Sequence, residues 1–119
     1  MTPIDKDNRL DPRIRTRVST VVFGRTGDLL EIPMVTVNLS RGGALCESDA
    51  PVPLGGTVNL RLDLETGAGA PQPVVLEAIV LRVEGRGPFQ VALHFSAVPA
   101  AAAGILRAYL ERLLRASAP

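Results

Sequence analysis

The sequence predicts an all-β domain with one C-terminal helix, in which six strands form a small antiparallel barrel. Runs of β-forming residues are separated by clusters of Gly, Pro, Asn and Asp, as expected for short strands joined by turns. The run at residues 57–65 alternates between apolar and polar side chains, which is typical of a strand with one wet face. After Pro99 the apolar residues recur at helical spacing instead. About six strands in meander order followed by one helix favour a barrel.

The first two strands are predicted from composition. Residues 18–25 are rich in valine and threonine, which favour strands. Residues 29–37 form the second strand, and Pro33 within it indicates an edge or a bulge. A turn signal at residues 25–28 joins the two strands as a hairpin.

The middle of the chain is divided by two glycine-bearing segments. A polar bend at residues 38–43 precedes a short strand at residues 44–47. Residues 48–56 hold two prolines and two glycines and are predicted to be a loop. The alternating strand at residues 57–65 follows this loop.

The last third of the chain is predicted to contain two strands and the helix. Residues 66–73 are rich in Gly and Pro and form a flexible loop. Strands at residues 74–83 and 89–96 follow, the second with regular alternation. The helix is expected at about residues 99–115, with an apolar stripe that covers the open end or side of the sheet. Contact between the helices of a homodimer is a second possible use of that stripe.

Composition indicates one domain in a reducing compartment. A length of 119 residues suits a single domain, and the formal net charge of +1 does not favour polyanion binding. The single cysteine, Cys46, cannot form a disulfide within the chain and lies in an apolar run, where a buried packing role is expected. No apolar segment approaches the roughly 20 residues that span a bilayer, so we expect a cytoplasmic protein.

The bend at residues 38–43, Asn-Leu-Ser-Arg-Gly-Gly, admits two interpretations. Asn38 and Ser40 are two residues apart, so on an extended backbone their side chains leave the same face. Gly42 and Gly43 supply a backbone that can take positive φ and that lets a ligand approach. Alternatively, the bend is a tight turn in which Asn and Ser bond their own backbone. Taken alone, the pattern favours the turn.

The N-terminal segment carries a basic cluster. Residues 1–12 are polar and include two prolines, which predicts a flexible tail. Arg13, Arg15 and Arg17 follow, directly before the first strand. By themselves they favour a solvated basic arm.

Together the two segments resemble the PilZ domain family. Its signature is R-x-x-x-R near the N-terminus followed by [D/N]-x-S-x-x-G, and Arg13, Arg17, Asn38, Ser40 and Gly43 match it in order. The resemblance covers roughly residues 9–115. It implies a single PilZ domain over residues 13–115, which consists of a six-stranded barrel and a C-terminal helix. The family is known for binding the bacterial second messenger cyclic di-GMP.

The resemblance implies the ligand-binding residues. Arg13 and Arg17 would bind guanine edges and phosphates, because an arginine fork matches the paired O6 and N7 acceptors of guanine. Asn38 and Ser40 would add polar contacts, and Gly43 would keep the floor of the site clear of side chains. Auxiliary positions are Arg9, Arg15, Arg41 and Gly42. Arg9 also forms an R-x-x-x-R with Arg13, but the pair Arg13 and Arg17 is preferred because Arg17 adjoins the strand.

Two positions leave the details of binding open. Ala92 stands where the family often has glycine, and its methyl group would lower affinity without abolishing it. In the family, the residue before R-x-x-x-R influences whether one or two ligand molecules bind. Here it is Pro12, so the stoichiometry is not predicted.

We therefore expect a cyclic di-GMP receptor whose N-terminal arm orders over the ligand and signals to a partner protein. The alternative is a PilZ-like adaptor that binds protein and no nucleotide. A barrel for single-stranded nucleic acid is disfavoured because that function needs exposed aromatic residues, and aromatics are only 3% of the chain. No catalytic, metal or cofactor role is expected, since His94 is the single histidine and Cys46 is predicted to be buried.

Overall fold

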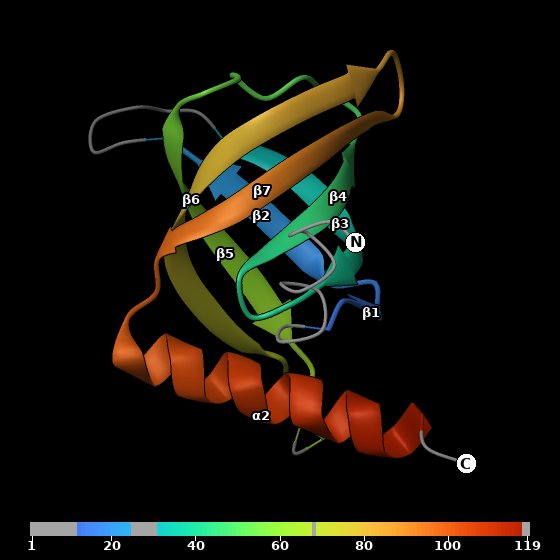
Figure 1. Ribbon diagram of the computed structural model, residues 1–119, viewed down its shortest axis with the longest axis vertical. Helices are drawn as coiled ribbons and strands as arrows, with labels where there is room; N and C mark the ends of the chain where they lie inside the picture. The colour runs from blue at the N-terminus through green and yellow to red at the C-terminus, as the bar shows by residue number, and fades with distance from the viewer. Residues whose placement is uncertain (1–11, 25–30, 68, 118–119) are drawn as a thin grey trace, which may run out of the picture.

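A computed structural model describes residues 12–24, 31–67 and 69–117 of the chain (Figure 1). Seven strands and one helix are present in these residues. The elements are β1 (Ile14–Arg15), β2 (Ser19–Phe23), β3 (Glu31–Leu39), β4 (Gly43–Ser48), β5 (Thr57–Leu64), β6 (Gln72–Gly85), β7 (Phe89–Ala97) and α2 (Ala100–Ser117). The predicted strands are all found, with bounds that differ by a few residues. The predicted turn at residues 25–28 lies outside the described residues.

Six strands close into an antiparallel barrel, as predicted. Around the barrel the order is β2, β3, β4, β7, β6 and β5, and β5 pairs with β2 to close the ring. The short β1 is an additional strand that pairs with the end of β3. Pro33 lies in the part of β3 that pairs with β2 before the pairing with β4 begins, which agrees with its predicted edge position.

The prediction of meander order is wrong at one connection. Strand β5 follows β4 in the chain, yet it pairs with β2 and β6, on the opposite side of the ring from β4. Residues 49–56 make this crossing, and eight extended residues reach up to roughly 26 Å. Gly55 N–H donates to the Val80 carbonyl and Val80 N–H to the Gly56 carbonyl, so the end of the loop is fixed against β6.

The inward faces of the strands form an aliphatic core. In β5 the four apolar residues of the alternating pattern are all buried, and their polar neighbours are partly exposed, as predicted. Cys46 is also buried in this core, and burial raises the pKa of its thiol to about 12. The thiol is therefore protonated at neutral pH and packs as a small apolar group, as predicted.

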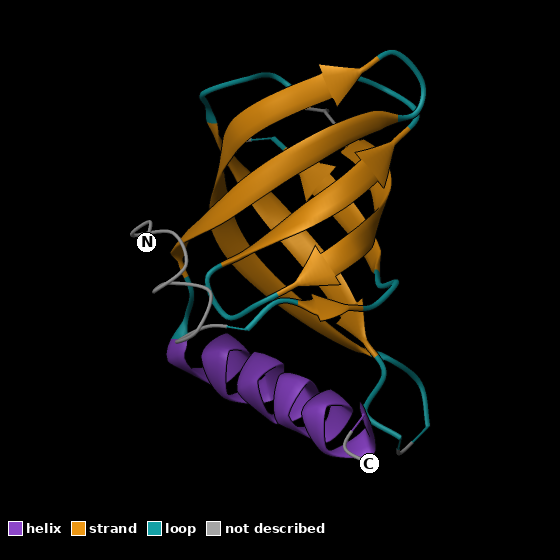
Figure 2. Ribbon diagram, turned by 45° about the vertical axis from the view of Figure 1, so that its right-hand side comes forward, coloured by secondary structure: helices purple, strands orange, loops and turns teal. Residues whose placement is uncertain are grey.

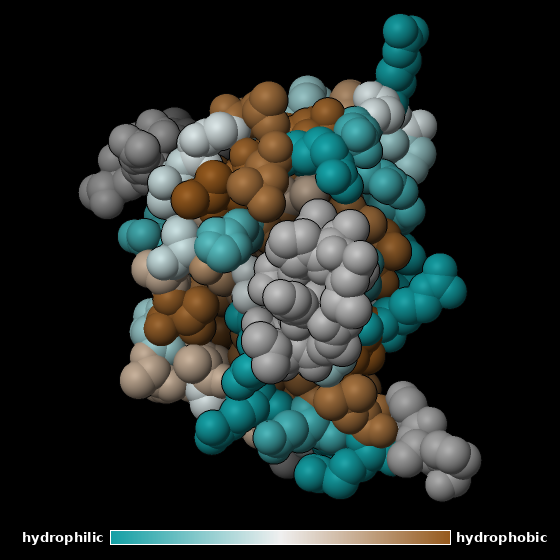
Figure 3. Space-filling view, in the orientation of Figure 1, coloured by the Kyte–Doolittle hydropathy of each residue, from teal (hydrophilic) through white to brown (hydrophobic). Residues whose placement is uncertain are grey.

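Helix α2 lies across one end of the barrel (Figure 2). The Pro99 carbonyl accepts the first helical hydrogen bond, from Ala103 N–H at 2.8 Å. Leu106, Tyr109 and Leu110 are buried in the common core, whereas hydrophilic side chains gather along the helix at the lower edge of the face in Figure 3. Most of the stripe is thus covered within one chain, and contact between helices in a dimer stays a prediction. No helix in the described residues is long and apolar enough to cross a membrane.

Candidate functional site

The predicted arginines lie on a segment that is bound to the barrel. Ile14 is opposite Leu39 and Arg15 is opposite Asn38 in the β1–β3 ladder. Arg13, Arg15 and Arg17 are exposed, while the residues between them turn towards the core. The three guanidinium groups therefore leave the same outer face, from positions spaced roughly 7 Å apart. Ile14 and Arg15 of the arm are already paired with β3, and the ordering of the arm on ligand binding stays a prediction.

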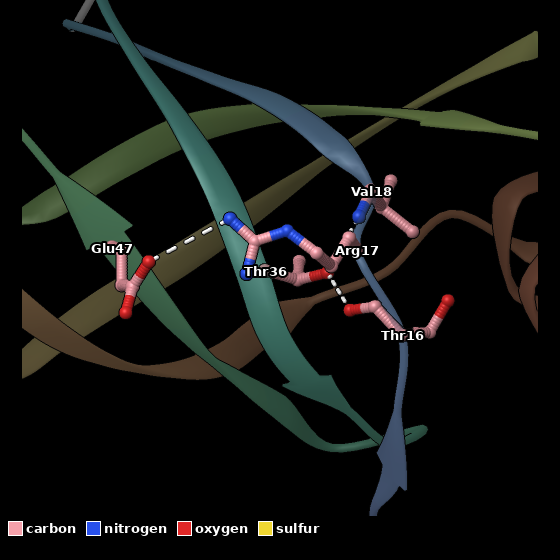
Figure 4. Close-up of polar contacts among 5 residues, drawn as sticks. All are labelled: Thr16, Arg17, Val18, Thr36 and Glu47. Atoms are coloured by element: carbon pink, nitrogen blue, oxygen red, sulfur yellow. Dashed lines mark hydrogen bonds and ion pairs between the residues drawn. The ribbon is translucent and has the colours of Figure 1, made fainter.

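A buried threonine holds the arm where β1 meets β2. Val18 N–H donates to Thr36 Oγ1 at 2.7 Å, and the Thr36 hydroxyl donates to the Thr16 carbonyl (Figure 4). Arg17 lies between these two anchored residues, so Thr36 sets the position of its backbone. The Thr16 hydroxyl in turn contacts the Tyr109 hydroxyl of α2 at 2.8 Å. Sequence reasoning missed Thr36, and the available signal was a hydroxyl residue at an inward position of an apolar strand.

Arg17 reaches across β3 to an acidic residue of β4. Figure 4 shows its side chain extending over the strand towards Glu47, and the Arg17 Nη2 and Glu47 Oε1 atoms are 3.6 Å apart. The side chains are 66% and 35% exposed, so water screens the pair. Glu47 was not predicted as a site residue, because its distance from Arg17 in the sequence hides their contact.

Asn38 has an unmet hydrogen-bonding requirement. The β3–β4 register shifts between Thr36 and Asn38, so Val37 is the extra residue of a bulge. Such bulges redirect side chains, and here both Val37 and Asn38 are partly exposed. The Oδ1 atom of Asn38 is buried and has no hydrogen-bond donor among the described residues. A buried acceptor without a donor costs about 1–3 kcal/mol, and a donor supplied by a ligand or a water would recover that cost.

Ser40 is part of a turn and does not extend the face of Asn38. Strand β3 ends at Leu39, so the premise of an extended backbone through Ser40 is wrong. The Ser40 Oγ atom accepts hydrogen bonds from the N–H groups of Gly42 and Gly43, each at 3.2 Å, and donates to the Gly43 carbonyl. The side chain is buried in its own turn, as the second interpretation of the bend predicted.

Gly43 is needed for contact with β7. A Cβ atom at this position would lie 2.4 Å from the Leu93 carbonyl oxygen. Its neighbour Gly42 accepts a backbone hydrogen bond from Phe95 at 2.9 Å. Neither Gly42 nor Gly43 has positive φ, so that part of the prediction is wrong. The two glycines join the turn to the last strand of the barrel.

Two small or aliphatic side chains lie beside Asn38 on the outer face of the barrel. In the strand register Asn38 is opposite Leu45 of β4, and Leu45 is opposite Ala92 of β7. Ala92 is in turn opposite Arg82 of β6. A strip five strands wide thus has Arg15 and Asn38 at one end, Arg82 at the other, and two small or aliphatic side chains between them.

Arg41 lies at the helix end of the barrel. It borders a hollow of about 340 Å³ against α2, which Arg107 also borders. Both arginines also border a hollow of about 170 Å³ that includes Ile14 and Pro12. Arg41 therefore lies near the start of the arm, as an auxiliary contact would require. A larger hollow of about 580 Å³, beside Tyr109 and Arg112, contains none of the predicted residues.

Two of the remaining positions named in the sequence analysis are Arg9 and His94. Arg9 lies outside the described residues. His94 is exposed on β7, as expected of a surface residue. Within the described part of the chain, no three His, Cys, Asp or Glu side chains are grouped closely enough to hold a metal ion.

Comparisons with known proteins identify the fold. A family model described as PilZ domain matches residues 7–112. Among solved structures, the chain is similar to the inhibitor of motility MotI/DgrA of Bacillus subtilis, with a TM-score of 0.72 and 19% identity over 88% of this chain and 50% of that one. No curated protein matches the sequence.

Two further structures are similar over nearly their whole length. The PilZ domain of YcgR from Escherichia coli, solved with c-di-GMP, has a TM-score of 0.66 and 12% identity, over 90% of this chain and 92% of that one. The PilZ domain of CeSA from a cellulose-synthesizing bacterium has a TM-score of 0.60 and 19% identity, over 85% and 97%. This chain therefore spans the isolated domains but only half the length of MotI/DgrA.

Proposed function

The chain belongs to the PilZ domain family, and on that premise we propose that it is a cytoplasmic receptor for cyclic di-GMP that signals to a partner protein. It acts by binding and carries out no catalysis. A PilZ domain of similar fold was solved with this ligand, which supports the choice of ligand class. The messenger is bacterial, and the proposal places this chain in a bacterial signalling pathway.

The observation that carries the proposal is the row of exposed arginines beside Asn38. Arg13, Arg15 and Arg17 are exposed, and within the described residues the exposed pair of Arg17 with Glu47 is the only ion pair that their side chains form. Guanine offers O6 and N7 as paired acceptors, and each phosphate accepts bidentate hydrogen bonds, so arginine forks suit both groups. Asn38 adds an unsatisfied polar group at the same place.

We assign roles accordingly. Arg13 and Arg17 bind guanine edges and phosphates, Arg15 and Arg41 add phosphate contacts, and Arg9 lies close enough in sequence to contribute. Asn38 contacts the ligand directly. Ser40, Gly42 and Gly43 act indirectly by shaping the turn below the site. The strip formed by Leu45 and Ala92 would support a base by van der Waals contact.

A titration of the purified protein with cyclic di-GMP tests the proposal. Calorimetry should give saturable binding, with a stoichiometry that decides between one and two ligand molecules. The melting temperature should rise with ligand by mass action. Cyclic di-AMP and GTP serve as controls, because adenine lacks the guanine O6 acceptor and GTP is not cyclic. If millimolar cyclic di-GMP gave no heat of binding and left the melting temperature unchanged, the receptor function would be ruled out.

One observation favours the alternative of a protein adaptor without a nucleotide. The guanidinium of Arg17 is already engaged by Glu47, which an anionic ligand must displace. The same titration decides, because an adaptor of this kind would give no response to any nucleotide.

A further inference from the structure

Arg17 differs from the other two arginines of the row by its charged partner. Its guanidinium lies 3.6 Å from the Glu47 carboxylate, whereas Arg13 and Arg15 form no ion pair within the described part of the chain. The three arginines otherwise share the same outer face and high exposure. The contact with Glu47 is therefore specific to one position of the row.

Glu47 lies on the outer face of the barrel, where an anionic ligand of Arg17 would lie. Its register partners are Val35 of β3 and Gln90 of β7, both uncharged. Glu47 thus places a negative charge next to the guanidinium. A phosphate bound to Arg17 would lie within a side-chain length of this carboxylate, and the two like charges would repel each other.

We propose that Glu47 is an internal counter-ion that competes with the anionic ligand for Arg17 and so lowers the affinity of the site. This inference rests on the proposed function. The ion pair between Arg17 and Glu47 is exposed and hence weak. The ligand can therefore displace the Glu47 carboxylate from Arg17. Because added salt screens the internal pair as well as the contacts with the ligand, wild-type affinity falls less steeply with salt than it would without Glu47.

The variant Glu47→Gln tests the proposal, since it removes the charge and keeps the shape. Calorimetry with cyclic di-GMP at low salt should show affinity increased by roughly threefold to fivefold. The gain should fall below about twofold in roughly 0.5 M salt, where exposed charges are screened. Unchanged or weaker binding by a folded Glu47→Gln protein would overturn the inference. Weaker binding would mean that the carboxylate accepts hydrogen bonds from the ligand.

Glu77→Gln is the matched control. Glu77 is exposed on β6, where its register partners are Asn59 of β5 and Ala97 of β7. Asn59 is opposite Phe23, at the end of β2 away from Arg17, so the variant makes the same change in net charge far from the arginine row, and affinity should change by less than about twofold. An equal gain in both variants would show a general effect of net charge and would refute a specific role of Glu47.

A double-mutant cycle tests whether Glu47 acts through Arg17. In an Arg17→Ala background, Glu47→Gln should raise affinity much less than in the wild-type chain, because the competed group is missing. The same gain in both backgrounds would contradict the proposal. The proposal would be supported most strongly if the Glu47→Gln variant bound the ligand and the wild-type chain did not.

If none of the proteins binds cyclic di-GMP, both the receptor function and the role of Glu47 are refuted. If the wild-type chain binds and Glu47→Gln binds equally well, only the role of Glu47 is refuted.

Discussion

The two halves of the PilZ signature lie in opposite physical environments. In the turn after β3, the Ser40 hydroxyl is buried and bonded to its own backbone, and Gly43 lies against the backbone of β7. In the arm, Arg13 and Arg17 are exposed, and the only ion pair of Arg17 in the described residues is a screened one. The difference shows that one motif can contain residues required for folding and residues available for binding. The turn residues serve the barrel, and the arginines are left for a ligand.

The largest effect is expected from Gly43→Ala, which should break the turn half. A Cβ atom 2.4 Å from the Leu93 carbonyl forces two backbones apart, which should lower the free energy of unfolding by about 2–4 kcal/mol. Urea denaturation measures the change. Gly56→Ala is the control, because a Cβ atom there meets nothing within 4 Å, and its stability should change by less than about 1 kcal/mol. Equal stability of the two variants would show that Gly43 serves the ligand only.

Arg17→Ala tests the arm half. Affinity for cyclic di-GMP should fall by about 1–3 kcal/mol, because a bidentate contact is lost. The free energy of unfolding should change by less than about 0.5 kcal/mol, since the pair with Glu47 is exposed. Calorimetry and urea denaturation measure the two effects. Arg115→Ala, in the last turn of α2, is a control of equal charge that should leave affinity unchanged. If Arg17→Ala lowered stability and left affinity unchanged, Arg17 would serve the fold and not the ligand.

A smaller effect, shared by both properties, is expected from Thr36→Val. The variant leaves the Val18 N–H and the Thr16 carbonyl without their side-chain partner, which should lower stability by about 1–2 kcal/mol. Affinity should also fall, because Arg17 loses its fixed backbone. Thr36→Ser keeps the hydroxyl and should restore most of the affinity. If Thr36→Val binds the ligand as the wild-type chain does, Thr36 belongs to the fold alone.

The pattern of alternation was enough to predict the barrel and its helix. Strands such as β5 and β7 can be predicted because side chains in a strand alternate between its two faces, and only one face is exposed to water. The crossing from β4 to β5 could not be predicted in this way. Alternation shows which face a residue occupies but not which strand lies beside it, and residues 49–56 are long enough to reach either neighbour.

The candidate site was predicted in part. The shared face of Arg13 and Arg17 follows from their spacing of four on an extended chain. The docking of the arm depends on Thr36, and its hydroxyl reaches Thr16 only after β3 has folded beside the arm. The bulge at Val37 is also a product of pairing with β4, so the exposure of Asn38 was not predictable from its spacing to Ser40.

The sequence by itself determined the types of the predicted elements, the buried face of each strand and the shared face of the arginines, because these depend on neighbours along the chain. Only the tertiary structure decided that Gly43 adjoins Leu93 and that Glu47 faces Arg17. Both contacts join residues that are far apart in the sequence, and such pairs are brought together only by the closure of the barrel.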